Sequence, residues 1–451
     1  MIPPRTNHDA PPAPGRSSPR SRSELAAMLA SLGIDLPCGE DIGILGQRVR
    51  IGNCEVGNRL VALPMEGCDC RPDGAPSAIT LRRYTRTAAG GSGTMWFEAA
   101  AVTEAGRSNP KAMWIHLGNL DSFKRMVGDV RAAAAKAGND PVLCLLQLTH
   151  AGRFARTGAA PAPAVTHRVP ELDRRQGFDD TLPLVSDAWL DELQDRFVAA
   201  ARLARAAGFD GVDVKSCHGY LLSALLGAHR RAGMYGGSYE NRTRMLRQTA
   251  GRIRAEVPGC MVAVRLNVWD ALAYPYGWGT SQADPAGPDL IEPVRLAGDL
   301  AAVGVDLLGV TAGIPRVDPH INRPSARYGG ACSDIAEHPL VGIKRIIDVT
   351  GTIQRAAACL PVVAAGLAWL GTLMPRVAAG IIAAGGATLI GQGRGTFAYP
   401  ESVGDILSGR GMDRRKVCVS CSKCSALMKL GGPAGCVVRD RAVYSLPKGQ
   451  Q

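Results

Sequence analysis

Short runs of apolar and β-branched residues recur along the chain, and longer segments with a helical period separate them. Runs of this length, bounded by glycine or polar clusters, are typical of strands buried on both faces. The predicted strands are residues 59–65, 93–101, 142–148, 211–214, 261–266, 306–310, 361–365 and 387–390. The main predicted helices between them are residues 81–89, 121–137, 186–207 and 238–257. This order suits an α/β fold of the (β/α)8 TIM-barrel type, whose chemistry lies at the carboxyl ends of the strands.

The run at 211–214 leads into the most reactive stretch of the sequence. Lys215, His218 and Tyr220 follow it within six positions. A single histidine is more often a satisfied core residue than a functional group. Three titratable side chains at one strand end favour a functional site instead. Beyond them, Ser238 follows a Gly-Gly turn and is predicted to cap the next helix.

The segment GFDGVDVKSCHGYLL at 208–222, followed by YGGSYENR at 235–242, resembles the Old Yellow Enzyme-like NADH:flavin oxidoreductase family. The resemblance is closest to its iron–sulfur branch, which includes 2,4-dienoyl-CoA reductase and trimethylamine dehydrogenase. It extends from about Asn58 to Arg439. It implies a TIM barrel that binds FMN and carries a C-terminal iron–sulfur cysteine loop. Larger members continue into FAD- and NAD-binding domains. No G-x-G-x-x-G follows a strand in this chain, so we expect only the barrel and the cluster segment.

The resemblance also implies a set of flavin-binding residues. These are Pro64, Met65, Glu66, Ala99, Gln147, Arg265, Gly366, Gly393 and Arg394. The chemistry of the residues agrees: a buried carboxamide such as Gln147 can both donate and accept, and an interior arginine such as Arg265 is costly unless paired. Small residues after the last two strands let backbone amides approach a phosphate. Leu367 replaces a glycine that is often seen in the family, so only Gly366 is assigned there.

The catalytic residues implied by the resemblance lie in the reactive stretch. Lys215 and His218 occupy the two positions where ene-reductases commonly carry a His/His or His/Asn pair, and Tyr220 matches the proton-donor tyrosine. Lys215 departs from the family pattern. A lysine favours an oxyanion or carboxylate more strongly than an imidazole does, so we expect an acidic or thioester substrate.

Four cysteines near the end of the chain form the second strong signal. They follow the pattern C-x2-C-x2-C-x11-C and are Cys418, Cys421, Cys424 and Cys436. Four thiolates at close spacing bind either zinc or a [4Fe–4S] cluster, and spacing alone does not decide between them. Three ligands crowded onto one compact loop suit the cluster better, and so does the resemblance to trimethylamine dehydrogenase. The pair Cys68 and Cys70 is a much weaker metal signal.

Three functions remain open at this stage. The first is an FMN- and [4Fe–4S]-dependent reductase of an activated C=C bond, with NAD(P)H as the expected electron donor. The second is an amine dehydrogenase of the oxidative demethylation type, which Lys215 disfavours because it would repel an ammonium substrate. The third is a non-catalytic electron-transfer flavoprotein subunit or zinc-stabilised scaffold. A visible spectrum and a metal analysis separate the three.

Composition narrows the choice of partners. The chain carries a formal net charge of +12, but only 5% of its residues are aromatic and no basic patch is interleaved with them, which excludes a nucleic-acid partner. An anionic substrate or an acidic electron-transfer partner, such as a ferredoxin or flavoprotein, fits the charge. Thirteen cysteines without a signal peptide or an apolar membrane span favour a reducing, cytoplasmic setting. We also expect a homo-oligomer.

The predicted domain organisation has three parts. Residues 1–48 form an N-terminal extension, disordered to about Arg22, where the sequence is rich in Pro, Arg and Ser. A short helix at 23–32, capped by Ser23, is expected within it. Residues 49–410 form the FMN-binding barrel, which begins with a hairpin at 50–58, and residues 411–451 form the cluster-binding segment.

Overall fold

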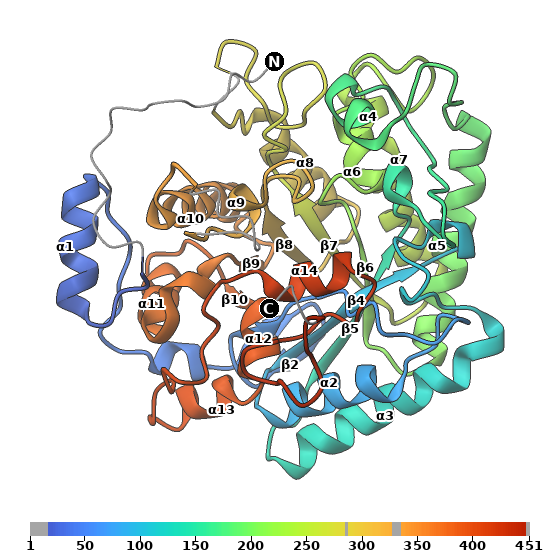
Figure 1. Cartoon of the computed structure of the whole chain (residues 1–451). Coiled ribbons are helices and arrows are strands. Elements are labelled where there is room, and N and C mark those ends of the chain that lie inside the picture. The colour runs from blue at the N-terminus through green and yellow to red at the C-terminus, as the bar shows by residue number, and fades with distance from the viewer. Residues whose placement is uncertain (1–16, 285–286, 327–334, 448–451) are drawn as a thin grey trace.

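A computed structural model describes residues 17–284, 287–326 and 335–447. Eight parallel strands close into a barrel in the order β10-β3-β4-β5-β6-β7-β8-β9 (Figure 1). They are β3 (Leu60–Ala62), β4 (Thr94–Ala101), β5 (Leu143–Thr149), β6 (Gly211–Val214), β7 (Met261–Asn267), β8 (Leu307–Thr311), β9 (Val362–Ala364) and β10 (Leu389–Gln392). Each predicted strand has its counterpart in the barrel, so the expected (β/α)8 fold is confirmed.

Amphipathic helices surround the barrel and shield its outer face (Figure 1). They are α2 (Ala78–Ala89), α3 (Leu120–Lys136), α5 (Asp187–Ala206), α7 (Tyr239–Glu256), α8 (Ile291–Ala302), α10 (Pro339–Ala356) and α11 (Met374–Ala383). Two of the long helices begin as the sequence predicts. The hydroxyl of Ser186 accepts from the backbone of Trp189, and that of Ser238 accepts from Asn241. Such caps satisfy amide groups that the first helical turn leaves unpaired.

Shorter elements complete the two ends of the barrel. A hairpin of β1 (Val49–Ile51) and β2 (Cys54–Val56) inserts Ile51 and Val56 against interior residues of the barrel, as the hairpin prediction requires. The short helices are α4 (Pro170–Gln176), α6 (Leu221–Leu226), α9 (Pro319–Asn322), α12 (Arg394–Ala398), α13 (Ser402–Leu407) and α14 (Lys423–Lys429). Single turns of 3-10 helix lie at Gly43–Gly46, Glu104–Gly106, Leu117–Asn119 and Gly152–Phe154, with a longer one at Leu367–Leu373.

The N-terminal region differs from its prediction in two ways. Helix α1 (Arg22–Leu32) is capped by Ser21, whose hydroxyl accepts from the backbone of Glu24, so Ser23 is not the cap. Ser21 has the extended backbone that a cap requires. Disorder was expected as far as Arg22, but the hydroxyl of Ser18 donates to the backbone carbonyl of Trp369. The rest of that expectation, for residues 1–16, lies outside the described residues.

The C-terminal segment returns to the barrel mouth. Asp440 accepts from Arg82 at 2.7 Å and from Arg86 at 3.1 Å, both on α2. Leu427, Tyr444 and Leu446 form a small apolar cluster beside it. The segment therefore contributes to one wall of the space above the strands, where the cavity lies.

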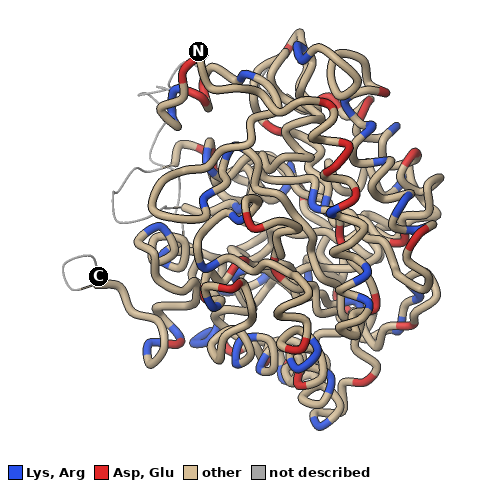
Figure 2. Tube along the Cα trace, turned by 90° about the vertical axis from the view of Figure 1, so that its right-hand side faces the viewer, with Lys and Arg blue, Asp and Glu red and all other residues tan. Residues whose placement is uncertain are grey.

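The charges and helices of the described residues bear on the expected partners. Basic and acidic positions occur side by side over most of the view in Figure 2, so the positive excess is not gathered into one patch there. Among the helices in the described ranges, none has both the length and the apolar character that crossing a bilayer requires.

Candidate active site at the carboxyl end of the barrel

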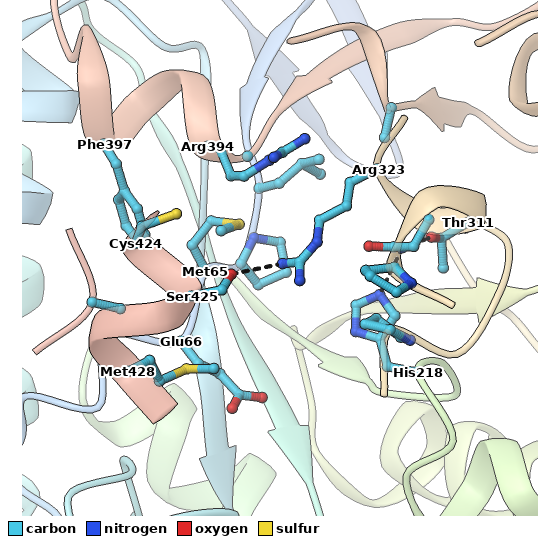
Figure 3. Close-up of a pocket in the computed structure, with 18 of the residues that line it drawn as sticks. Met65, Glu66, His218, Thr311, Arg323, Arg394, Phe397, Cys424, Ser425 and Met428 are labelled. Atoms are coloured by element: carbon cyan, nitrogen blue, oxygen red, sulfur yellow. Dashed lines mark hydrogen bonds between the residues drawn. The ribbon is translucent and has the colours of Figure 1, made fainter. Parts of the chain in front are cut away.

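A cavity of ≈ 800 Å³ opens at the carboxyl ends of the strands. Its walls come from the strand ends, from the loop that holds α9, and from α14 of the C-terminal segment (Figure 3). Cavities of this size bind cofactors and drug-sized ligands. In a (β/α)8 barrel this end also carries the chemistry.

Most of the residues predicted from the sequence meet at this cavity. Those that line it are Pro64, Met65, Glu66, Lys215, His218, Tyr220, Arg265, Gly366, Gly393, Arg394, Cys418 and Cys424. Ala99 and Gln147 are not among the lining residues. The amide nitrogen of Gln147 donates to the Asp213 carboxylate at 2.5 Å, so that nitrogen is committed inside the barrel. Flavin contacts of Ala99 and Gln147 therefore remain predictions that the cavity lining does not support.

Glu66 lies where the predicted catalytic residues meet. It follows β3 and accepts hydrogen bonds from three side chains that are far from it in the sequence. Lys215 Nζ lies 2.7 Å from Glu66 Oε1, and the Tyr220 hydroxyl lies 2.9 and 3.0 Å from the two carboxylate oxygens. Ser108 Oγ donates to Oε2 at 3.0 Å. Burial would raise the pKa of Glu66, but the charge of Lys215 and these hydrogen bonds outweigh it and lower the pKa.

Lys215 and Tyr220 thus have a partner that the sequence did not reveal. Lys215 is 3% exposed, and its Nζ also lies 3.7 Å from the centre of the Tyr220 ring. Burial and the Glu66 charge raise the pKa of Tyr220 well above its usual range. Both side chains are held by one carboxylate. Glu66 itself was predicted only as a flavin contact.

His218 faces the cavity from a strained turn. Its φ is 65° and that of Gly219 is 72°, so the chain turns sharply four residues after β6 ends. Positive φ is uncommon for a residue other than glycine. His218 Nε2 lies 3.2 Å from the amide nitrogen of Asn322, which also donates to Thr311 at 2.8 Å. An amide nitrogen only donates, so Nε2 accepts and Nδ1 carries the proton.

The imidazole of His218 is neutral at physiological pH. Burial lowers its pKa well below the usual value, and the charges of Arg265, Lys215 and Arg323 lower it further. Its Nδ1–H is therefore a neutral hydrogen-bond donor. The sequence pattern assigned no role to its partner Asn322. Nothing in the sequence pattern singled out Ser108.

Two arginines that line the cavity have no carboxylate partner among the described residues. Arg265 and Arg394 are each 7% exposed, and neither forms an ion pair among the described residues. Arg265 Nη1 lies 3.4 Å from the Pro64 carbonyl, and Arg394 Nη1 lies 3.2 Å from Ser422 Oγ. A buried guanidinium without an anion is costly, so this wall is built for an anionic ligand.

The backbone beside Arg394 supports the same conclusion. Gly366 has a φ of 89°, which side chains rarely adopt. A Cβ on Gly393 would lie 3.0 Å from Met65 Sδ, so a larger residue would crowd this wall. Together with the two arginines, this surface fits the phosphate and the polar ring edge of a flavin mononucleotide.

The charge of the whole cavity is strongly biased. Among its described lining residues, Glu66 is the single acid. The basic lining residues are nine, namely Arg153, Arg156, Arg175, Lys215, Arg265, Arg316, Arg323, Arg394 and Lys429. Such a lining attracts anions and disfavours a cationic ligand.

The cysteine segment lies against this cavity. Cys418 and Cys424 line it, and the thiols of Cys418 and Cys421 act electrostatically on both Cys424 and Cys436. Ser420 and Ser422 adopt φ values of 53° and 56°, which turn the loop sharply between the cysteines. Backbone amides of Ser420 and Arg439 donate to the sulfurs of Cys418 and Cys436, each at 3.4 Å.

The separation of the sulfurs distinguishes two metal centres. Tetrahedral zinc with Zn–S bonds of about 2.3 Å holds its sulfurs about 3.8 Å apart. Among the described residues, the only group of three or more His, Cys, Asp or Glu ligand atoms that all lie within 4.8 Å of one another is Asp69, Cys70 and Glu98. No three of the four sulfurs therefore lie within 4.8 Å of one another.

That other group is already satisfied internally. Arg83 Nη2 lies 3.0 Å from Asp69 and 2.8 Å from Glu98. Cys70 contacts Thr80 at 4.0 Å. The guanidinium supplies the positive charge that a metal ion would otherwise provide, so the weak metal signal of Cys68 and Cys70 gains no support.

Comparisons with known proteins agree with this geometry. Residues 45–278 match the NADH:flavin oxidoreductase / NADH oxidase family. The chain is 28% identical over 384 residues to an NADH oxidase of Thermoanaerobacter brockii, covering 83% of this chain and 52% of that protein. It is 30% identical over 270 residues to an NADPH dehydrogenase of Listeria monocytogenes, covering 58% of this chain and 72% of that protein.

Solved structures show the same fold. A 2-naphthoyl-CoA reductase in complex with 2-naphthoyl-CoA superposes with a TM-score of 0.68 at 19% identity. The match covers 89% of this chain and 57% of the reductase, so the chain spans little more than half of that protein, as it does of the NADH oxidase. The family match spans more than half of the chain. The chain therefore belongs to the NADH:flavin oxidoreductase / NADH oxidase family of flavin-dependent oxidoreductases.

Proposed function

We propose that the protein is an FMN- and [4Fe–4S]-dependent oxidoreductase that reduces the activated C=C bond of an unsaturated carbonyl, acid or thioester. One observation carries the choice of reaction. The strand end presents Lys215 and a neutral His218 in a cavity whose lining holds nine basic residues and one acid. Donors of this kind stabilise negative charge that develops on a substrate oxygen. The 2-naphthoyl-CoA reductase among the structural relatives acts on a thioester of this class by its name.

The residues that would hold FMN are those on the wall without carboxylates. Arg394 and Gly393 would bind the phosphate, together with the main chain at Gly366. Arg265, above Pro64 and Met65, would face the polar edge of the ring. FMN, when bound, supplies a hydride to an electron-poor carbon. Everything else in the reaction is positioning, charge stabilisation and proton delivery by the chain.

The chain's own residues then divide the remaining work. Lys215 Nζ donates one bond to Glu66 and has further N–H groups that can donate to a substrate oxygen. His218 Nδ1–H can donate to the same oxygen, because Asn322 fixes its tautomer. Tyr220 supplies the proton to the carbon next to the carbonyl. Together the two donors would stabilise the enolate while that proton arrives.

The four cysteines would hold one [4Fe–4S] cluster in the segment 411–451, beside the FMN-binding barrel of residues 49–410. Three of the ligands are crowded onto one short loop, which supports a cluster over zinc. Metal analysis of anaerobically prepared protein tests it. We expect about four iron atoms per chain and loss of iron from each Cys→Ala variant. Stoichiometric zinc without iron would overturn the assignment.

An amine dehydrogenase is the second candidate. Glu66 weakens one objection to it, because it neutralises Lys215 at 2.7 Å. The basic lining as a whole still opposes a cationic substrate. Amine-driven bleaching of the flavin would favour this candidate over the first. An electron-transfer subunit would show neither bleaching by amines nor re-oxidation by unsaturated compounds.

The deciding experiment is an anaerobic visible spectrum of the purified protein, titrated with NADH, NADPH and reduced ferredoxin. We expect a flavin band above broad iron–sulfur absorption, bleaching by one donor, and re-oxidation by an unsaturated ketone or acid. Absence of a flavin band in freshly purified and FMN-supplemented protein would contradict the proposal. The titration also identifies the electron donor. The homo-oligomer and the cytoplasmic location stay predictions.

A further inference from the structure

The hydroxyl proton of Tyr220 is directed at Glu66. The oxygen lies 2.9 and 3.0 Å from the two oxygens of Glu66. An ionised carboxylate only accepts, so Tyr220 is the donor in this contact. A hydroxyl has one proton and cannot give it to Glu66 and to a substrate carbon at the same time. As arranged, the carboxylate holds the proton back.

Direct transfer from Tyr220 would also leave two anions in contact. Tyrosinate would form about 3 Å from the Glu66 carboxylate, with the phenol buried and the carboxylate only 19% exposed. The raised pKa of Tyr220, which follows from burial and the Glu66 charge, expresses the same cost. Efficient proton transfer from Tyr220 therefore requires a replacement proton to arrive at its oxygen.

Lys215 is placed to supply that replacement. Its ammonium group is 2.7 Å from Glu66 Oε1, and the Tyr220 oxygen is 3.0 Å from Oε2. The carboxylate thus stands between a cationic N–H and the phenol oxygen. Once protonated, Glu66 becomes a donor to the phenol, and the original Tyr220 proton is free to leave.

We propose that Glu66 is a proton-relay residue that passes a proton from Lys215 to Tyr220 while Tyr220 protonates the substrate. The relay rests on the proposed function. One Lys215 N–H bond breaks and one Glu66 O–H bond forms. That O–H bond breaks as a new Tyr220 O–H bond forms, and the original Tyr220 proton bonds to the carbon with the electron pair of the enolate. Lys215 ends neutral, the enolate charge is consumed, and solvent later reprotonates the amine.

The other groups around Glu66 do not compete for this role. Cys68 also feels the Glu66 charge, and burial with that charge raises the thiol's pKa well above its usual range. Arg316 lies near Tyr220 and acts to lower its pKa, but burial and Glu66 prevail. Ser108 donates to Oε2 and holds the carboxylate without titrating. Burial and the charges of Arg265, Lys215 and Arg323 lower the pKa of His218, so its ring stays neutral.

The test uses FMN-loaded full-length protein, reduced and then mixed with 2-cyclohexen-1-one or crotonic acid as probes. Glu66→Gln keeps the shape and one accepting oxygen but cannot pass a proton. We expect re-oxidation to slow about 100-fold, within the usual range for a lost acid–base group. In mixtures of H₂O and D₂O the wild-type rate should depend on deuterium fraction along a curve, because more than one proton moves. The Glu66→Gln dependence should be linear.

Two further variants separate relay from simple placement. Glu66→Asp keeps a carboxylate at a longer reach and should recover part of the rate and the curved dependence. Glu104→Gln is the matched control, because Glu104 is 58% exposed, pairs with Arg107 and does not line the cavity. It should behave as wild type in every measurement.

A second readout needs neither FMN nor turnover. Ultraviolet difference titration follows phenol ionisation, and subtraction of Tyr220→Phe isolates Tyr220. Glu66→Gln removes the negative charge beside the phenol, so Tyr220 should ionise at lower pH than in wild type.

The outcomes distinguish the relay from the function on which it rests. A wild-type protein that binds and reduces FMN, yet is re-oxidised by neither probe, overturns the proposed function. A wild-type protein that is re-oxidised with a linear deuterium dependence overturns the relay alone. So does a Glu66→Gln variant that is re-oxidised at the wild-type rate, or one whose Tyr220 titration is unchanged.

Discussion

Two buried arginine sites stand on either side of β3 and differ in one respect. Arg83 lies between Asp69 and Glu98, all three nearly inaccessible to solvent. Arg394 is as deeply buried, yet among the described residues it forms no ion pair and donates to Ser422 Oγ at 3.2 Å. A buried cation with its own anions completes the fold, whereas one without them is completed by a ligand. Lys215 is a third case, because its anion, Glu66, is also the proposed proton-relay residue.

The largest expected effect is on stability, from Arg83→Met. Removing the guanidinium leaves two carboxylates buried side by side, and burial already raises the pKa of Glu98 although Arg83 opposes this. We expect a loss of about 3–5 kcal/mol in the free energy of unfolding at neutral pH. Urea denaturation measures it. The exposed pair of Arg48 and Glu55, at 3.1 Å, is the control, and Arg48→Met should cost at most about 1 kcal/mol. Equal losses in the two variants would break the comparison.

Lys215→Met should affect rate more than stability or flavin binding. Loss of one donor to a developing oxyanion typically slows a reaction about 10²–10³-fold. Re-oxidation by an unsaturated ketone should fall by that factor, while FMN stays bound and its reduction by the donor is nearly unchanged. Stopped-flow measurement of the two half-reactions provides the check. A variant that slows reduction instead would place Lys215 in the donor's site and not the substrate's.

Asp213 is the buried anion of the barrel interior, and it predicts a pH dependence. Burial raises its pKa to about 6, despite bonds from Gln147, Trp96 and the backbone of Arg265. An unfolded chain loses this proton near pH 4. The folded state therefore binds more protons between these values, and stability falls as pH rises from about 4 to 6. The contribution is at most about 3 kcal/mol, because each tenfold change in proton affinity corresponds to about 1.4 kcal/mol.

Denaturation curves across that range test the assignment. Asp213→Asn should have a flatter dependence of stability on pH than wild type. Asp270 is a fitting comparison, because burial raises its pKa to about 6 as well. Asp270→Asn should flatten the curve independently, and the two effects should add. An unchanged slope in Asp213→Asn would show that the carboxyl is ionised throughout.

Arg394→Ala should have the smallest effect, and on binding alone. The lost contact to phosphate is a charge-assisted hydrogen bond of about 1.5–3 kcal/mol, or roughly 10- to 150-fold in the FMN dissociation constant. Stability of the flavin-free protein should hold or rise, because no buried carboxylate is left without its partner. Equilibrium dialysis with FMN gives the dissociation constant. Denaturation without FMN gives the stability of the flavin-free protein. Unchanged FMN retention would contradict the phosphate assignment.

The barrel could be predicted because its strands are short, mostly apolar runs. Polar residues follow most of these runs at their C-terminal ends. The segment from Gly211 to Tyr220 shows both halves of that pattern. The partnership of Glu66 with Lys215 could not be predicted, because the residues lie 149 positions apart and only barrel closure brings them together. Ser108 and Asn322 were missed for the same reason. The helix cap was predicted at Ser23 instead of Ser21 because both serines satisfy the same local rule. The backbone geometry decides between them.

The roof of the cavity has a consequence for assembly. Arg323 donates a hydrogen bond to Ser425 at 2.9 Å (Figure 3), and Arg394 donates one to Ser422. Both arginines line the cavity, so they bind the cysteine segment to the cavity wall. A ligand that stabilises the cysteine segment therefore also stabilises this wall of the cavity. Occupancy of the cysteines and occupancy of the barrel should then be thermodynamically linked, each increasing the affinity for the other by the same factor. The proposed iron–sulfur cluster would then also strengthen the retention of flavin.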